Sequence, residues 1–72
     1  MRDIIITHQP VELYKILKFE GMARSGGEAK MLIEQGEVLV NGAVETRKRK
    51  KIIAGDQIQL FDDCARIVLD EA

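Results

Sequence analysis

The sequence predicts an α+β domain in which a two-helix hairpin packs on a small, mostly antiparallel β-sheet. Two observations carry this prediction. Apolar residues recur at helical spacing in residues 10–20 and 26–35, and a glycine follows each segment. Beyond the second glycine the spacing becomes that of extended chain, and the dipeptide Asn41-Gly42 is typical of a tight hairpin turn. Residues 1–72 are expected to form one domain with a compact core, because folding of so short a chain removes only roughly 60% of its surface from water.

The N-terminal part is expected to hold a strand and the first helix. Residues 4–6 are three consecutive isoleucines, a β-branched run typical of a short strand. Pro10 suits the first turn of a helix, where its missing N–H is not needed. Gly21 then ends the segment, so the first helix is predicted from about Pro10 to Glu20. Its apolar side is formed by Leu13, Ile16, Leu17 and Phe19.

The second helix has clearer signals at both ends. Ser25 is followed three residues later by Glu28, which is a capping-box pattern. Gly36 is a typical left-handed terminator, so the helix is predicted over residues 26–35. Only a few residues separate the two helices, which should therefore pack together as a hairpin. The apolar face of the second helix consists of Ala29, Leu32 and Ile33.

The remaining segments read as strands. Residues 38–40 are apolar and lead into the hairpin turn, and Val44 begins the returning strand. Residues 57–60 alternate polar and apolar, as a half-buried strand should. Residues 64–69 supply the last strand. The order of elements is therefore typical of two helices packed on one small sheet.

Positive charge is concentrated in one part of the chain. The net charge is −1, yet residues 15–51 hold nine Lys and Arg against five Glu, and residues 47–51 are five consecutive cations. These five residues are not expected to form a regular strand with one buried face, because that alternation would bury two or three charges at a high desolvation cost. The run is therefore predicted to be an exposed arm or loop.

This basic run has two interpretations. It can be a solvated edge that prevents strand-to-strand aggregation. Alternatively it binds a polyanion, since five neighbouring cations repel one another unless an anion answers them, and arginines suit bidentate contact with phosphate. The second interpretation is favoured.

A second candidate site precedes the second helix. Arg24 and Ser25 are followed by Gly26-Gly27, which allows close approach to the unpaired N–H groups of a helix N-terminus. Lys30 could extend the same positive surface. The other interpretation is purely structural: Ser25 is simply a good helix cap and Lys30 a solvated side chain.

The ordered set of these residues resembles the αL RNA-binding motif, the domain of the ribosomal protein S-four family. The resemblance covers about residues 10–60, and the stretch 41–49 is similar to the stand-alone bacterial members called the YbcJ type. The matching residues are Gly21, Ala23, Arg24, Ser25, Glu28, Ala29, Lys30, Ile33, Gly36, Val38, Val40, Asn41, Gly42, Gly55 and Asp56.

The resemblance implies binding of structured RNA, such as ribosomal or transfer RNA. The implied contacts from the second helix and its approach are Arg24, Ser25 and Lys30. From the arm they are Arg47, Lys48 and Arg49, and charge alone adds Lys50 and Lys51.

The sequence departs from the family pattern in two places, the start of the first helix and Gly26. Many relatives read Arg-Leu-Asp-Lys at the start of the first helix, whereas this chain has an acid, Glu12, in place of the arginine and Tyr14 in place of the aspartate. Gly26 stands where relatives often carry a second arginine. The footprint of the RNA is therefore expected to shift toward the arm.

Three aromatic residues bear on the kind of RNA. Phe19 and Phe61 are expected in the core, with Tyr14 half exposed. A platform for stacking unpaired bases needs several exposed rings. We therefore expect recognition of RNA shape and phosphate spacing rather than of a single-stranded sequence.

Catalysis is not predicted, and neither is a cofactor or a metal. The single histidine, His8, is expected at the entry to the first helix. Cys64 is expected to be a packing residue. Because it is the single cysteine, an internal disulfide is excluded. No apolar stretch approaches the roughly 20 residues needed to span a membrane. A cytoplasmic monomer is expected.

The alternative function is that of a protein-interaction module. In this interpretation the basic arm docks on an acidic partner, or the acidic C-terminal end meets a basic one. The ribosome or another protein would be that partner. Such a module should have a salt-sensitive protein partner and be indifferent to RNase.

Overall fold

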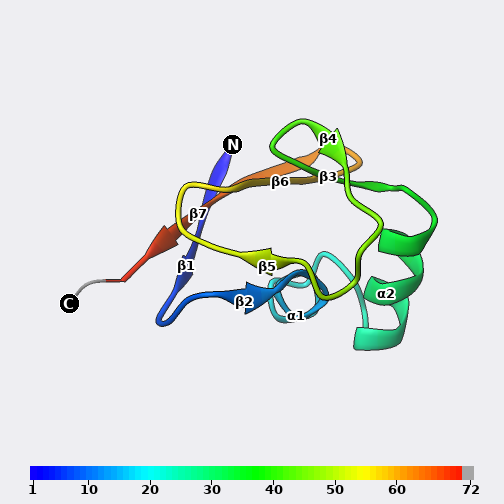
Figure 1. Ribbon diagram of the computed structural model, residues 1–72, viewed down its shortest axis with the longest axis horizontal. Coiled ribbons are helices and arrows are strands. Elements are labelled where there is room, and N and C mark those ends of the chain that lie inside the picture. Colours follow the sequence, from blue (N-terminus) through cyan, green and yellow to red (C-terminus); the bar gives the residue numbers. More distant parts are fainter. Residues whose placement is uncertain (71–72) are drawn as a thin grey trace.

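The computed structural model describes residues 1–70, which contain two helices and seven strands (Figure 1). The helices are α1 (Leu13–Phe19) and α2 (Gly26–Glu34). The strands are β1 (Arg2–Ile6), β2 (Val11–Glu12), β3 (Val38–Val40), β4 (Ala43–Val44), β5 (Lys51–Ile52), β6 (Gln57–Leu60) and β7 (Asp63–Leu69). This arrangement confirms the predicted α+β class.

Five strands form the main sheet, in the order β1-β7-β6-β3-β4. Every pair is antiparallel except β1 and β7, which run parallel with Arg2 opposite Ala65 and Ile6 opposite Leu69. The first and last strands of the described chain therefore lie side by side. Strands β2 and β5 form a separate antiparallel pair.

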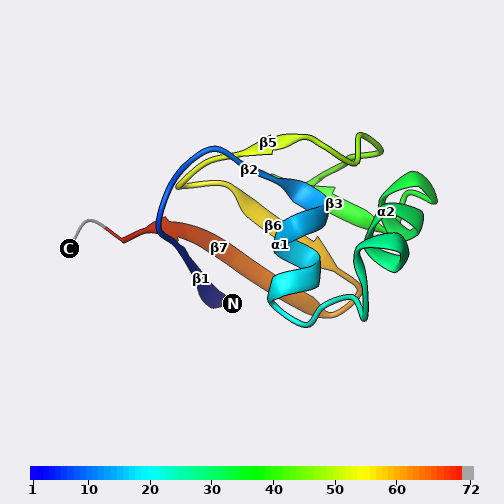
Figure 2. The same ribbon diagram turned by 90° about the horizontal axis from the view of Figure 1, so that it is seen from below.

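The core lies between the main sheet and the elements beneath it. Figure 2, seen from below, shows α1 in front of the middle of the sheet, with α2 beside it toward the β3 end. Both helices contribute fully buried side chains, as do β1, β3, β5, β6 and β7. The largest of these side chains are Ile4, Leu13, Leu17, Ile33, Ile52, Ile58, Ile67 and Val38. The helix hairpin is thus held by the same core as the sheet.

The first helix begins at Leu13, so the prediction that it starts at Pro10 was wrong. Val11 and Glu12 are extended and pair with Ile52 and Lys51 of β5. This pairing overrides the local preference of proline for a first helical turn. At the other end the prediction is confirmed, because Gly21 takes a φ of 73° just beyond the helix.

Two aromatic residues are also not where the sequence placed them. Phe19, the last residue of α1, is exposed, and so is Phe61 in the two-residue turn between β6 and β7. Phe61 has a φ of 54°, a left-handed turn conformation. Tyr14 is half-buried, as expected. The core is aliphatic throughout the described residues.

Helix α2 is confirmed with its cap. The Ser25 Oγ accepts a hydrogen bond from the Glu28 N–H at 3.1 Å. The Glu28 carboxylate in turn accepts one from the Arg24 N–H at 3.0 Å. A capping box normally closes on the N-cap residue itself, whereas here it closes one residue earlier and so fixes the chain that enters the helix.

Two turns of the αL pattern are locked together by side chains. Asn41, with a φ of 52°, donates from Nδ2 to the Asp56 carboxylate at 3.0 Å, and its Oδ1 accepts from the Gln57 N–H at 2.8 Å. The Asp56 carboxylate also accepts from the Ile53 N–H at 3.0 Å. These bonds hold the β3–β4 hairpin against the turn before β6. They therefore fix the positions at which the segment between β4 and β6 begins and ends.

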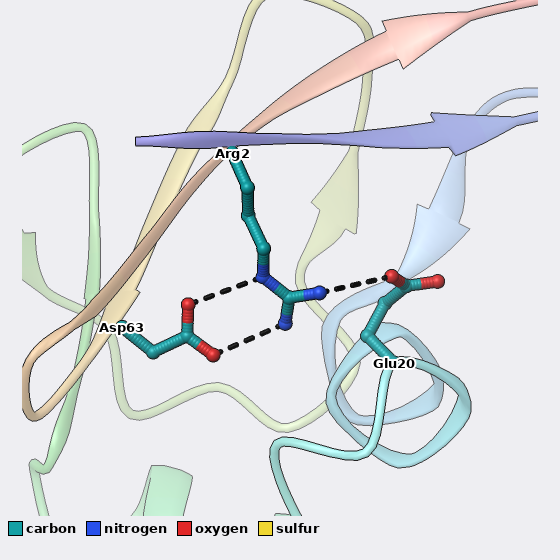
Figure 3. Close-up of polar contacts among 3 residues, drawn as sticks. All are labelled: Arg2, Glu20 and Asp63. Carbon is teal, nitrogen blue, oxygen red and sulfur yellow. Dashed lines mark hydrogen bonds and ion pairs between the residues drawn. The ribbon is translucent and has the colours of Figure 1, made fainter.

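Charged side chains of β1 and β7 form ion pairs with one another and with the end of α1. Arg2 forms a two-pronged contact with Asp63, at 3.2 and 3.1 Å, and reaches Glu20 at 3.5 Å (Figure 3). It thereby joins β1, β7 and the C-terminal end of α1. Arg66 pairs with Asp3 in the same two strands. Both arginines of these strands are thus paired with acids of the chain.

Candidate nucleic-acid interface

The five consecutive cations, residues 47–51, are referred to below as the basic arm. They follow β4 and pass alongside both helices before entering the sheet pair β2–β5 (Figure 1). Four of them are exposed and Lys50 is half-buried. The predicted exposed arm is therefore present, although its last residue, Lys51, begins strand β5.

The backbone of the basic arm is fixed against the start of α1. The Leu13 N–H donates to the Lys50 carbonyl at 3.0 Å, and the Tyr14 N–H donates to the Lys48 carbonyl at 3.1 Å. Glu12, the N-cap of this helix, makes no capping bond with its side chain. The arm therefore caps α1, and these two N–H groups are not open to a phosphate.

Three of the arm cations form ion pairs with acids of the same chain. These ion pairs were not predicted from the sequence. The Arg47 Nε lies 2.9 Å from Glu45, the Lys48 Nζ lies 3.1 Å from Glu34, and the Arg49 Nε lies 3.7 Å from Glu12. The last two acids belong to α2 and β2, far from the arm in sequence. Only the Arg47 pair, two residues apart, could have been guessed from spacing.

Two of these acids are held ionised by their partners. Hydrogen bonds from the Arg47 side chain lower the pKa of Glu45 to about 2. The hydrogen bond from Lys15 is the largest influence on Glu12, and it lowers the pKa of that carboxyl. Both acids are therefore anionic throughout the neutral range.

The start of α2 is the second part of the candidate interface. Arg24 is exposed, and its guanidinium makes no ion pair within residues 1–70. The Ser25 hydroxyl acts as a cap acceptor but keeps its own hydrogen free to donate. Lys30, one turn further, lies with its Nζ 4.6 Å from the centre of the Tyr14 ring, a cation–π contact.

Tyr14 joins the two parts of the candidate interface, although the sequence did not single it out as a site residue. Its ring makes the cation–π contact with Lys30 of α2, and its backbone N–H donates to the Lys48 carbonyl in the basic arm. A Cβ atom on Gly26 would lie 3.9 Å from this ring, so α1 and α2 meet here. Lys30 and the arm are thereby brought together. The signal that could have revealed Tyr14 is its place in the altered first-helix pattern.

The cations without an ion pair come from the same region. Of the positively charged side chains, five form no ion pair within the described residues. They belong to α1, the connection between the helices, α2 and the basic arm: Lys18, Arg24, Lys30, Lys50 and Lys51. By contrast, the cations of β1 and β7 are paired. Open positive charge is thus available to a polyanion at the helices and the arm.

Other candidate chemistry finds little support in the structure. No group of three or more His, Cys, Asp or Glu within residues 1–70 is arranged to hold a metal ion. Neither of the helices in that range is long and apolar enough to cross a membrane. Cys64 is half-buried, as predicted. His8 lies in the connection between β1 and β2, within 3.5 Å of the Thr7 hydroxyl.

Two substitutions at Ser25 should separate its capping role from contact with a ligand. Ser25→Ala removes the cap and is expected to lower the free energy of unfolding by about 1 kcal/mol, whereas Ser25→Gly should cost only a few tenths. Both variants lack the hydroxyl. Thermal unfolding checks the first effect. If the hydroxyl contacts a polyanion, both variants lose the same affinity despite their unequal stabilities; a loss only in the alanine variant would show that Ser25 is a cap alone.

Comparison with known proteins gives consistent matches. A family model described as S4 domain matches residues 4–68. The chain is 48% identical over 61 residues to "Putative RNA-binding protein YbcJ" of Escherichia coli (strain K12), covering 85% of this chain and 87% of that protein. It is 33% identical over 57 residues to "Probable ribosome maturation protein RlbA" of Bacillus subtilis (strain 168), covering 79% and 80%.

A solved structure has the same fold. The solution structure of YbcJ from E. coli aligns with a TM-score of 0.72 at 43% identity, covering 94% of this chain and 87% of that one. The YbcJ structure is described as revealing an αL motif involved in RNA-binding. The predicted resemblance and the αL architecture are therefore confirmed.

Proposed function

The chain belongs to the S4-domain family, and we propose that it binds structured RNA, without catalysing a reaction, through the start of α2 and the basic arm. The observation that carries the proposal is the arm itself. Its backbone is fixed by the Leu13 and Tyr14 N–H groups while four of its five cationic side chains remain exposed. Because this backbone is already ordered, the arm loses less conformational entropy on meeting a fixed array of phosphates than a flexible segment would.

The relatives support this proposal by what their names and descriptions state. YbcJ is named as RNA-binding, and the description of its structure connects RNA-binding with the αL motif. The name of the Bacillus subtilis relative refers to ribosome maturation. Ribosomal RNA is accordingly our first choice of ligand and transfer RNA the second.

The proposed contacts form two groups. Around α2 they are Arg24, Ser25 and Lys30, and in the basic arm they are Arg47, Lys48, Arg49, Lys50 and Lys51. Arginine can bridge two phosphate oxygens, and the lysines act as mobile point charges. The N-terminus of α1 is left out, because the arm occupies it and Glu12 stands beside it.

Recognition is proposed to follow shape rather than base sequence. Phe19 and Phe61 are exposed, contrary to expectation, but they lie on different elements, the end of α1 and the β6–β7 turn. The ring of Tyr14 is already in contact with Lys30. The Lys18 Nζ likewise lies 5.7 Å from the centre of the Phe19 ring, so two of the three aromatic rings in residues 1–70 already contact a lysine, which does not favour a stacking platform for bases. Phosphate spacing in folded RNA is the property that fixed cations can read.

Titration of the purified protein with ribosomal and transfer RNA tests the proposal. We expect binding that weakens with salt. If roughly four phosphates are contacted, the logarithm of affinity should fall against the logarithm of salt with a slope of about −3 to −4. Fluorescence anisotropy with labelled RNA at several salt concentrations measures this slope. Absence of binding to both RNAs at low salt would refute the proposal.

A protein partner is the second candidate, because the arm already pairs with carboxylates of its own chain. Arg47 and Lys48 approach Glu45 and Glu34 as they would approach acids of a partner. Capture of partners from a lysate separates the two functions: material retained through RNA is lost on RNase treatment, whereas a directly bound acidic protein stays. We further propose that the protein acts as a monomer in the cytoplasm, where these RNAs are found.

A further inference from the structure

The three acids that face the basic arm come from three different elements. Glu45 follows β4, Glu34 ends α2 and Glu12 belongs to β2. Each acid lies within 3.7 Å of a different arm cation. Glu12 also holds Lys15 at 3.0 Å and stands opposite Lys51 in the β2–β5 pair. The fold therefore surrounds the proposed RNA-binding arm with its own counterions.

The arm is held mainly by bonds other than these ion pairs. Its backbone is held by the Leu13 and Tyr14 N–H groups, by the Lys50 N–H bonded to the Arg47 carbonyl at 3.2 Å, and by the β2–β5 pairing. All of these bonds join backbone atoms. In addition, the Arg47 N–H donates to the Glu45 carboxylate at 3.0 Å, and a glutamine at residue 45 keeps an acceptor oxygen for it. The arm cations can consequently leave their acids without unfolding the segment that carries them.

The cations are better placed to move than two of their acids. The side chains of Arg47 and Arg49 are 70% and 69% exposed, whereas those of Glu45 and Glu12 are 13% and 20% exposed. A cation that turns toward a phosphate therefore leaves a carboxylate behind at nearly the same place. That carboxylate repels any phosphate that approaches without engaging the cation.

We propose that Glu12, Glu34 and Glu45 are specificity-determining residues, built-in counterions that make the basic arm select folded RNA over flexible polyanions. The inference rests on the proposed function. A folded RNA presents several phosphates in a fixed array and displaces the three acids in one event. A flexible polyanion must order its own phosphates to do the same, so it loses more conformational entropy for each ion pair exchanged.

Replacing the three acids by their amides tests this inference. The variant Glu12→Gln, Glu34→Gln, Glu45→Gln keeps side-chain size and removes three negative charges. Its affinity should rise for both a transfer RNA and poly(U), but more for poly(U). The affinity for transfer RNA divided by the affinity for poly(U) should fall about tenfold, the scale expected when three ion pairs with solvent-accessible cations are lost. The matched control is Asp3→Asn, Glu20→Gln, Asp62→Asn, which makes the same charge change away from the arm and should leave the ratio unaltered.

The outcomes are distinguishable. An unchanged ratio in the arm variant, or an equal change in the control, would overturn the inference. A loss of transfer RNA affinity at unchanged melting temperature would also overturn it, because the acids would then position the arm. If the wild-type protein binds neither RNA, the proposed function fails, and the inference is judged with inorganic polyphosphate, which the arm variant must bind at least several-fold more tightly.

A single substitution guards against misfolding of the triple variant. The side chain of Glu34 is 56% exposed, and Lys48 is its ion-pair partner within the described residues. Glu34→Gln should therefore fold normally. It should shift the ratio of affinities in the same direction by about twofold, and a shift in the opposite direction would count against the inference.

Discussion

Changing Arg47, Lys48 and Arg49 together to Glu is expected to lower the affinity for folded RNA by about 100-fold or more. Each of the three side chains is exposed and close to the next along a fixed backbone. The change removes three proposed phosphate contacts and puts carboxylates in their place, next to three acids that are already there. Repulsion of the phosphates then adds to the lost attraction.

The fold should survive this change, because no arm side chain of the triple variant is buried. Far-ultraviolet circular dichroism and thermal unfolding check this point before RNA is added. The salt dependence of any residual binding should also become shallower, since fewer phosphates are engaged. An RNA affinity equal to that of the wild-type protein would show that the arm is not the binding site.

A matched pair of single substitutions separates the local from the overall charge. Arg49 and Arg66 are both exposed, and each pairs with one acid, at 3.7 and 3.5 Å. Arg49→Glu and Arg66→Glu therefore alter the net charge equally and each break one exposed ion pair. We expect a clear loss of RNA affinity for the first and at most a twofold loss, about the limit of a general charge effect, for the second.

Local signals explain why one helix could be predicted to within a residue and the other could not. Helix α2 begins at a serine cap and ends at a left-handed glycine, and both signals act over a few residues. The start of α1 depends instead on the pairing of Val11–Glu12 with Lys51–Ile52, about forty residues away. The preference of proline for the first turn of a helix depends on nearby residues alone, so it could not predict this strand pairing.

The exposure of the basic arm could be predicted, but its electrostatic surroundings could not. Desolvation alone excludes five cations from the core, whatever the topology. The acids opposite Lys48 and Arg49 come from α2 and β2, so their positions depend on the finished fold. For the same reason Tyr14 was missed as the residue that joins Lys30 to the arm. The sequence thus predicted that the candidate site is positively charged. The acids that lie beside its cations could be identified only from the folded structure.

Ile52→Ala is expected to lower the free energy of unfolding by about 2–5 kcal/mol, whereas the neighbouring Ile53→Ala should change it by less than about 1 kcal/mol. Ile52 is fully buried, while Ile53 is 49% exposed, so the same chemical change is made inside and outside the core. A domain of this size has a stability of only about 4–10 kcal/mol, and the loss at Ile52 is therefore large. Urea unfolding followed by circular dichroism measures both values.

The substitution at Ile52 should also loosen the basic arm. The last arm residue, Lys51, belongs to β5, and the buried Ile52 side chain anchors that strand in the core. The Leu13 and Tyr14 N–H groups donate to arm carbonyls, so their hydrogen exchange reports on how firmly the arm is held. Exchange at these two amides should accelerate in Ile52→Ala and stay near the wild-type rate in Ile53→Ala. Acceleration no greater than that of the α2 amides would mean that the arm opens only with the whole domain. Faster exchange confined to Leu13 and Tyr14, accompanied by weaker RNA binding, would connect the rigidity of the arm directly to its proposed function.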